Sequence, residues 1–356
     1  MIRRAFRTRA VLAASALLVS VAFSSVAAKG PARRPGLHDT REQVEGAREL
    51  MGTTCTVSVE SRDSQWSRRC MQEAFDTIAD LDSVLSSWRE DSELSHVNAA
   101  GAETRIGCSE PFYACLDSAL VIAAETNGAF DPTVEPLNRV WDLRGDGRVP
   151  EPGELADARA LVGFHLLSVV PGARTVRFPR PGMGLDFGGI GKGFALDAAM
   201  DQLYRRGVKR ALVNLGGQIS TFTDGEAWTV QIADPADRLK PAVRLVVRRT
   251  SISTSSQSEH HFTANGRDYG HILDPRRGEP VNTNASVTVL APSGTRADGL
   301  STAFLVMGRD AVDAYLDGHP EIGALWMEPT QDGIRAWRWH LATVSVEPGI
   351  AVQWMN

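Results

Sequence analysis

Four glycines surround a single lysine, Lys192, in the segment Leu185–Asp197, which reads LDFGGIGKGFALD. Glycine-rich turns often hold phosphate groups, because their backbone N–H groups can approach the anion closely. The spacing matches neither the GxxxxGK[ST] P-loop nor the GxGxxG dinucleotide motif. The segment therefore predicts either a phosphate-binding turn or a strand-to-helix turn in which the glycines relieve backbone strain.

A carboxylate and a hydroxyl lie four residues apart at Asp298 and Thr302, in the segment RADGLSTA. On a helix this spacing places both side chains on one face. Together they could ligate a hard divalent cation, which prefers oxygen ligands. The alternative is structural: Asp298 caps the helix and the Thr302 hydroxyl bonds back to it.

His271 is a candidate for proton transfer. It stands in the segment Tyr269–Pro275, where it leads into a short apolar pair and an Asp-Pro turn. That arrangement could present the imidazole at a cleft, although a structural histidine explains it as well. His260 and His261 are adjacent, but no third ligand follows at the spacing of a zinc site.

Two further polar clusters lie at the ends of predicted elements, where binding sites are often built. Residues 87–95 read SWREDSELS and combine an aromatic ring with charged groups. Residues 128–133 read GAFDPT and hold an aromatic ring and an acid in a turn fixed by proline. Taken alone, the first is equally a capped loop between helices and the second an ordinary Asp-Pro turn.

The elements that must position these residues are mixed helices and strands. Several neighbouring strands are joined by short turns, which favours an α+β fold with substantial antiparallel sheet over a doubly wound parallel sheet. The periodicity of apolar residues predicts the following elements. Helices are predicted over 69–85, 111–126, 157–162, 194–206 and 297–307, with another beginning near Asp310, and strands over 54–59, 166–170, 175–178, 211–214, 228–233, 242–247, 251–255 and 286–290, with further strands in 323–351.

The first 28 residues predict a secretory signal peptide. A basic segment is followed by an apolar run and by small residues that permit cleavage near Ala28. The pair Arg3-Arg4 resembles a twin-arginine signal, but paired arginines are common in basic leaders, so Sec export is preferred. Residues 29–47 predict a linker or N-terminal arm ahead of one domain over 48–356.

Composition narrows the function further. The chain has 356 residues, of which 43% are hydrophobic, enough for a large domain. Removing the leader leaves 34 basic and 43 acidic residues, a charge of about −9, which makes nucleic-acid binding a poor candidate. Cys55, Cys70, Cys108 and Cys115 form no CxxC pair. They could form disulfides in an exported protein, with Cys108 and Cys115 nearest in sequence, or stay as small buried residues.

Together these clusters resemble the ApbE family, the FAD:protein FMN transferases. The resemblance covers residues 51–308, with weaker agreement beyond, and its pieces follow the order of the family. They are Met51-Gly52-Thr53, SWREDSELS, GAFDPTV, LDFGGIGKGFALD, Leu215-Gly216-Gly217, Ile252-Ser253-Thr254-Ser255, HILDP and ADGLSTA.

The resemblance implies two interlocked α/β lobes with FAD in the cleft between them. It implies a Mg²⁺ site made by the backbone carbonyl of Gly189 with Asp298 and Thr302. Trp88 stands where the family often has tyrosine, and Ser256 where it commonly has glycine, which affects the expected backbone path. The residues implied to contact the flavin nucleotide or to line its pocket are Met51, Trp88, Ala129, Phe130, Asp131, Asp186, Lys192 and Ile272.

The resemblance also implies a reaction. A Thr or Ser hydroxyl of a target redox protein attacks the phosphorus on the FMN side of FAD, and AMP leaves. The cation neutralises the charge that builds on the bridging oxygen. His271 is the expected general base for the incoming hydroxyl, so the rate should fall as pH drops through the imidazole range, near ~6.5.

Two other functions use parts of the same site. With water as the acceptor, it would be a Mg²⁺-dependent FAD pyrophosphatase that yields FMN and AMP. A non-catalytic periplasmic FAD-binding protein would not need the Asp298–Thr302 pair. The expected partners are FAD and a target subunit in the periplasm, with no nucleic acid, and peripheral association with membrane redox complexes is compatible with that role.

Overall fold

The computed structural model describes residues 41–258 and 260–355, so the predicted signal peptide lies outside the described residues. Its largest feature is a nine-stranded sheet, in which every neighbouring pair is antiparallel except β17 and β19. This confirms the predicted α+β fold with largely antiparallel sheet. In spatial order the strands are β1 (Glu42–Leu50), β2 (Thr53–Ser61), β6 (Arg210–Leu215), β7 (Gln218–Thr223), β10 (Thr250–Ser256), β15 (Ser286–Ala291), β16 (Gly323–Thr330), β17 (Gly333–Trp339) and β19 (Val352–Trp354).

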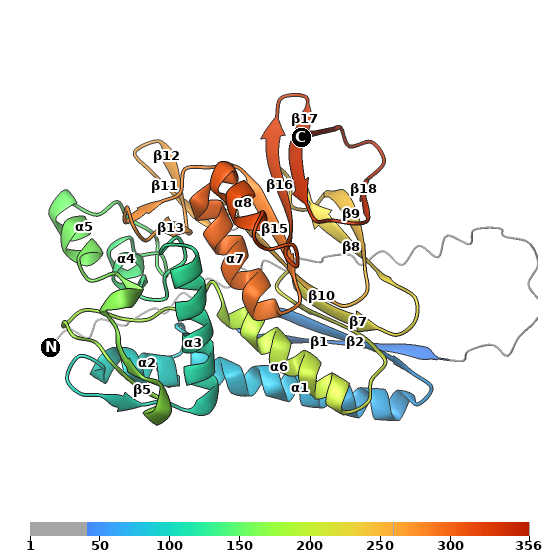
Figure 1. Ribbon diagram of the computed structural model, residues 1–356, viewed down its shortest axis with the longest axis horizontal. Helices are drawn as coiled ribbons and strands as arrows, with labels where there is room; N and C mark the ends of the chain where they lie inside the picture. Colours follow the sequence, from blue (N-terminus) through green and yellow to red (C-terminus); the bar gives the residue numbers. More distant parts are fainter. Residues whose placement is uncertain (1–40, 259, 356) are drawn as a thin grey trace, which may run out of the picture.

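The large sheet is covered on both faces (Figure 1). Successive side chains of a strand point to opposite faces, and β6 shows the result. Val213 and Leu215 belong to the core beneath the helices, whereas Leu212 belongs to the core beneath a smaller sheet. The covering helices are α1 (Ser64–Leu85), α6 (Gly191–Arg205) and α7 (Gly294–Met307), and the smaller sheet has the order β18 (Val344–Val346), β9 (Pro241–Val247), β8 (Trp228–Ala233).

The remaining elements gather beside α7, on the left of Figure 1. A separate apolar cluster that includes Leu137, Trp141 and Leu273 joins segments far apart in sequence. The Trp141 indole N–H donates to the carbonyl of Gly278 at 2.8 Å and fixes that junction. The elements of this part are α2 (Glu93–Ala100), α3 (Glu110–Glu125), α4 (Glu135–Val140), α5 (Pro152–Arg159), the sheet β3 (Ile106–Gly107), β5 (Thr175–Arg177), β4 (Ser168–Val170), the hairpins β11 (His261–Ala264) with β12 (Arg267–Gly270) and β13 (Leu273–Asp274) with β14 (Glu279–Pro280), and the short helices η1 (Phe164–Leu166) and η2 (Pro171–Ala173), while α8 (Arg309–Leu316) follows α7.

Some elements begin at other residues than the sequence predicts. Part of the arm predicted over 29–47 is strand, because β1 begins at Glu42 and pairs with β2 along its length. Only Val44 of this edge strand is buried. The sequence therefore lacks the apolar alternation from which a strand would be predicted. Helix α6 begins at Gly191, inside the glycine segment, and α7 begins at Gly294 behind the cap Ser293.

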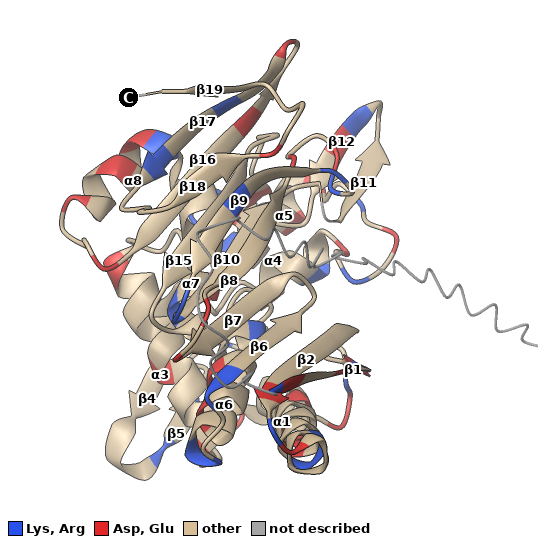
Figure 2. Ribbon diagram, turned by 90° about the vertical axis from the view of Figure 1, so that its right-hand side faces the viewer, with Lys and Arg blue, Asp and Glu red and all other residues tan. Residues whose placement is uncertain are grey.

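The structure describes the state of the cysteines, the lengths of the helices and the distribution of charged residues. All four cysteines are free and buried, which confirms the alternative of small buried residues. In the part of the chain that is described, no helix is long and apolar enough to span a membrane. Figure 2 shows residues of both charge signs on α1, α6 and α8.

Helices α6 and α7 cross at two glycines and cap each other. The Asp298 carboxylate on α7 accepts the backbone N–H of Gly193 on α6 at 2.9 Å. In return, the Asp197 carboxylate on α6 accepts the N–H of Thr295 at 2.9 Å and also that of Gly294. Each carboxylate therefore accepts a backbone N–H that has no partner within its own helix. Its negative charge also lies at the positive N-terminal end of the other helix.

The crossing leaves no room for a side chain. A Cβ on Gly193 would lie 2.6 Å from the Cβ of Asp298 and closer still to the carbonyl oxygen of Gly294, and a Cβ on Gly294 would lie 2.6 Å from the carbonyl oxygen of Gly193. Real Cβ atoms essentially never approach that closely, and two of these neighbours are backbone atoms that cannot rotate away. Both glycines are therefore required by the close approach of the two helices.

Gly193→Ala should lower the free energy of unfolding by roughly 1–3 kcal/mol or more, because a new methyl group must push the two helices apart. A loss of stability would be informative, because replacing glycine by alanine within a helix normally raises the free energy of unfolding by about 1 kcal/mol. The matched control is Gly153→Ala in α5, where a new Cβ would meet nothing within 4 Å. Urea denaturation measures both variants, and equal stability for the two would contradict the proposed crowding.

Candidate functional site

The glycine segment is a tight turn that leads directly into α6. The Asp186 carboxylate accepts the N–H of Gly188 at 2.7 Å, and the Phe187 carbonyl accepts the N–H groups of Ile190 and Gly191. Lys192 lies in the first helical turn, with its Nζ 3.4 Å from the carbonyl oxygen of Gly188. A helix N-terminus and a lysine thus place positive charge at one point, as anion binding requires.

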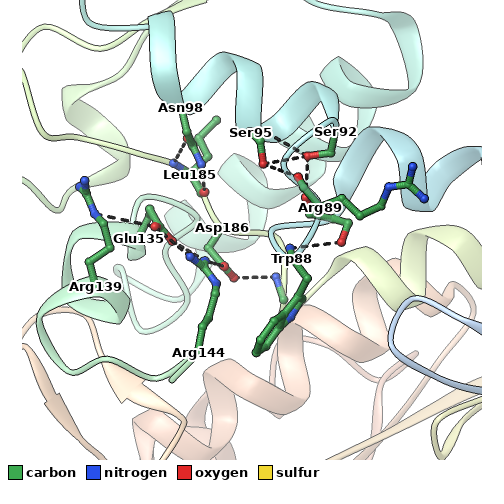
Figure 3. Close-up of polar contacts among 12 residues, drawn as sticks. Trp88, Arg89, Ser92, Ser95, Asn98, Glu135, Arg139, Arg144, Leu185 and Asp186 are labelled. Carbon is green, nitrogen blue, oxygen red and sulfur yellow. Dashed lines mark hydrogen bonds and ion pairs between the residues drawn. The ribbon is translucent and has the colours of Figure 1, made fainter. Parts of the chain in front are cut away.

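Asp186 is held by an arginine that sequence reasoning missed. Arg144 contacts Asp186 at 2.6 Å and Glu135 at 3.0 Å, and both acids are largely buried (Figure 3). Burial raises the pKa of Glu135, while the Arg144 guanidinium opposes that rise. The two carboxylates in turn raise the pKa of Arg144 against the effect of burial. Arg144 lies outside every predicted helix, strand and motif, so nothing in the sequence marked this residue.

Two of the three predicted metal-ligand residues, Gly189 and Thr302, meet where α7 passes the glycine turn, and Asp298 lies one helical turn before Thr302. Asp298 is buried, and its carboxylate also accepts a hydrogen bond from the Nε2 of Gln218. A Cβ built on Gly189 would lie 3.2 Å from the Thr302 hydroxyl oxygen, so that residue and Thr302 are direct neighbours. One carboxylate, one hydroxyl and one carbonyl form an oxygen donor set that suits Mg²⁺, which takes few protein ligands.

The structural alternative for Asp298 and Thr302 is wrong in its details. The N-cap of α7 is Ser293, and Asp298 caps α6 instead. The hydroxyl that bonds back to the Asp298 carbonyl belongs to Ser301, at 2.9 Å, rather than to Thr302. In the described ranges there is no cluster of three His, Cys, Asp or Glu residues that could hold a metal, so a cation here would depend on neutral oxygens as well.

Buried hydroxyls fix α7 against β10. The Ser301 hydroxyl lies 3.1 Å from that of Ser253 and 2.9 Å from that of Ser255. The Ser255 hydroxyl also lies 3.4 Å from that of Thr302, which links the ligand-bearing face of α7 to the sheet. Ser256, where the family commonly has glycine, sits in β10 opposite Ser286, so its serine fits ordinary extended backbone.

His271 is half-buried, and its ring orientation is fixed. Its Nδ1 lies 3.1 Å from the carbonyl oxygen of His260, so Nδ1 carries the proton and Nε2 keeps a lone pair. Burial lowers the pKa of His271 to about 4, and the positive charges of Lys192 and Arg238 lower it further. The expected titration near ~6.5 is therefore corrected downwards.

Met51 and Trp88 are presented by two tight loops. Met51 and Gly52 connect β1 to β2 with φ of 51° and 71°, a two-residue hairpin turn with left-handed backbone. A Cβ on Gly191 would lie 3.8 Å from the Met51 methyl carbon, so the hairpin tip reaches the glycine turn. Trp88 is 70% exposed, on a loop pinned by the hydroxyl of Ser92 (Figure 3).

The segment 129–131 reaches the site through its aromatic ring. The Phe130 ring lies 3.2 Å from the position of a Cβ on Gly189. Asp131, expected to line the pocket, uses its carboxylate internally: it accepts the N–H of Thr133 and the N–H of Phe164, each at 2.8 Å. Burial raises the pKa of Asp131. Its side chain thus holds the turn in place, and a cavity of about 500 Å³ opens beside it, lined by residues that include Arg159 and Arg276.

Ala129 and Ile272 are both buried, at 1% and 8% exposure. The backbone N–H of Ile272 donates to the amide oxygen of Gln257 at 2.9 Å, which ties the residue after His271 to the end of β10. Gln257 is a second supporting residue that sequence reasoning missed. Only its position after a serine-rich strand distinguishes it in the sequence.

Comparison with known proteins gives a consistent result. The family model described as the ApbE family matches residues 51–326. The FAD:protein FMN transferase of Treponema pallidum is 33% identical over 79% of this chain and 83% of its own length, and that of Salmonella typhimurium is 32% identical over 72% and 77%. The apo structure of the Pseudomonas stutzeri flavinyl transferase ApbE has a TM-score of 0.73 at 30% identity, covering 85% of this chain and 95% of its own.

Arg144→Met should lower the free energy of unfolding by on the order of 3 kcal/mol, because two buried carboxylates lose their shared countercharge. The loss should shrink as pH falls, since protonation of Glu135 removes the unpaired charge. The control is Arg139→Met, because Arg139 is 52% exposed and lies 3.7 Å from Glu135, where an ion pair contributes under about 1 kcal/mol. Equal losses in both variants, measured by urea denaturation, would show that the network carries no special stability.

Proposed function

The chain belongs to the ApbE family, and we propose that it is an FAD:protein FMN transferase that links FMN by a phosphoester to a Thr or Ser hydroxyl of a target redox protein. The observation that carries this proposal is the convergence of three groups. Gly189 is a direct neighbour of Thr302 on α7, Lys192 lies in the first turn of the helix that follows the glycine turn, and the charge of Lys192 acts on His271. A metal, a phosphate-binding turn and a base are what phosphoryl transfer to a hydroxyl needs.

In the proposed reaction, the acceptor oxygen forms a bond to the phosphorus on the FMN side of FAD. The bond from that phosphorus to the bridging oxygen breaks, and AMP leaves with the electron pair. Asp298, Thr302 and the Gly189 carbonyl would hold Mg²⁺, which supplies positive charge beside the pyrophosphate. Lys192 and the N-terminus of α6 add further positive charge to the same group.

His271 takes the proton of the incoming hydroxyl in this scheme. Its Nε2 carries the free lone pair because Nδ1 is engaged by the His260 carbonyl. A pKa of about 4 keeps the imidazole neutral throughout the physiological range, so it is always in the form that accepts a proton. Burial is the main cause of this low pKa, and the Lys192 charge, which adds to it, would face the pyrophosphate.

The binding of FAD is assigned to the residues around the glycine turn. Trp88 offers an exposed indole for stacking on a flat ring. Asp186, fixed by Arg144, is assigned to accept a hydrogen bond from a donor group of the nucleotide. Met51 lies near Gly191 and Phe130 near Gly189, and both contribute apolar surface.

We further propose that the protein is exported and works in the periplasm after removal of its leader near Ala28. The support is the order of basic, apolar and small residues at the N-terminus. A target redox subunit, free or attached to a membrane complex, would meet the enzyme there.

The test of the proposed function uses protein recovered from the periplasm, whose N-terminal sequence also checks the leader cleavage. Incubation with FAD, Mg²⁺ and a periplasmic redox subunit should add a flavin-sized mass to that subunit and release AMP. Asp298→Ala should abolish Mg²⁺ binding, because a hydroxyl and a carbonyl alone are weak ligands for a strongly hydrated ion. His271→Ala should keep FAD and Mg²⁺ binding but slow transfer by roughly 10²–10⁴-fold.

Other outcomes of that experiment identify the alternatives. Free FMN and AMP without any labelled subunit would indicate a pyrophosphatase, and binding of FAD without AMP release a non-catalytic carrier. Loss of FAD binding in His271→Ala would make His271 a pocket residue instead of the base.

The pH dependence follows from the low pKa of His271. The transfer rate should stay level from neutral pH down to about 5 and then fall through about 4, as the imidazole becomes protonated. The unfolded histidine titrates near ~6.5, so the unfolded state binds more protons between these values and stability should fall as pH falls from about 6.5 to 4. Comparing wild type with His271→Ala isolates this component, and a rate that already drops near pH 6.5 would show that the base is a solvated group.

A further inference from the structure

Two glutamines of this protein are buried to the same degree but are satisfied differently. Gln218 and Gln257 are each 7% exposed. The amide of Gln257 uses both ends: Nε2 donates to the carbonyls of Ile272 and Val281 at 2.7 and 2.9 Å, and its oxygen accepts the Ile272 N–H. This is the usual state of a buried amide.

Gln218 uses only one end of its amide. Its Nε2 donates to the carboxylate of Asp298, while its Oε1 is buried and has no hydrogen-bond partner among the described residues. The amide cannot be turned round, because Oε1 would then face a carboxylate oxygen and both are acceptors. The unpartnered oxygen therefore stays beside the acid that the proposed metal site depends on.

Leaving a buried carbonyl oxygen unpaired is costly, and the backbone here is built to hold Gln218 in place. It follows the turn Gly216-Gly217, whose φ angles are 63° and 94°, and the N–H of Gly217 donates to the Asn214 side chain at 2.8 Å. An amide oxygen is also a ligand of the same hard type as the other three groups of the site, and it brings no additional negative charge.

We propose that Gln218 belongs to the cation site: its Oε1 binds the Mg²⁺ held by Asp298, directly or through one water of its hydration shell, while its Nε2 orients the Asp298 carboxylate. This inference rests on the proposed function, since that function requires the cation. It assigns a donor on β7 to a site whose other ligands come from α7 and the glycine turn.

The experiment titrates Mg²⁺ calorimetrically into FAD-saturated protein and records the melting temperature in EDTA and in Mg²⁺. Gln218→Leu should weaken Mg²⁺ binding by roughly 10–100-fold, the usual effect of losing a group that supports a metal ligand. Gln218→Glu should melt lower in EDTA, because two carboxylates then face each other, and should recover most of the loss when Mg²⁺ is added. The control Gln257→Leu should melt lower in both conditions by a similar amount and keep its Mg²⁺ affinity.

The outcomes separate the two proposals. Wild type that binds Mg²⁺, together with Gln218→Leu that binds it equally well, would overturn only the role of Gln218. Gln218→Glu that stays destabilised in Mg²⁺ would do the same, and it remains informative if the leucine variant fails to fold. Wild type that binds no Mg²⁺ would overturn both the metal role in the proposed function and this inference.

Discussion

The reciprocal capping of α6 and α7 is the constraint on which the site depends. Two helices meet at glycines 193 and 294, and each carries the aspartate that the other needs at its N-terminus. Because both caps are made across the contact, neither helix can shift without leaving polar groups unpaired in a buried place. The glycine turn, which enters α6, and Thr302, which lies one turn beyond Asp298, are positioned by the same contact.

This constraint gives Asp298 two roles that share one carboxylate. One oxygen accepts a backbone N–H and the other accepts the Gln218 amide, yet a carboxylate has further lone pairs available to a cation. Arg144 orients the Asp186 carboxylate in the same way that the N-terminus of α6 orients that of Asp298. The site is therefore built from acids that are already immobilised by the fold before any ligand arrives.

The sequence predicted the elements with strong apolar periodicity and the residues that belong to local motifs. It placed strand 228–233 at its observed boundaries, and it marked the glycine turn and the helix of Asp298 and Thr302, which the fold brings into contact. It missed β1, whose residues are mostly exposed, and it missed Arg144 and Gln218, whose importance arises only from partners far away in the chain. The lowered pKa of His271 could not be predicted from the sequence either, because it is caused by burial in the folded protein.

The four buried thiols have a consequence for how such a chain matures. Burial raises the pKa of Cys55 to about 12 and that of Cys108 to about 11. Only the thiolate attacks a disulfide, so in the native state these sulfurs exchange with external oxidants extremely slowly. Once the chain is folded, these cysteines would stay reduced even in oxidising surroundings.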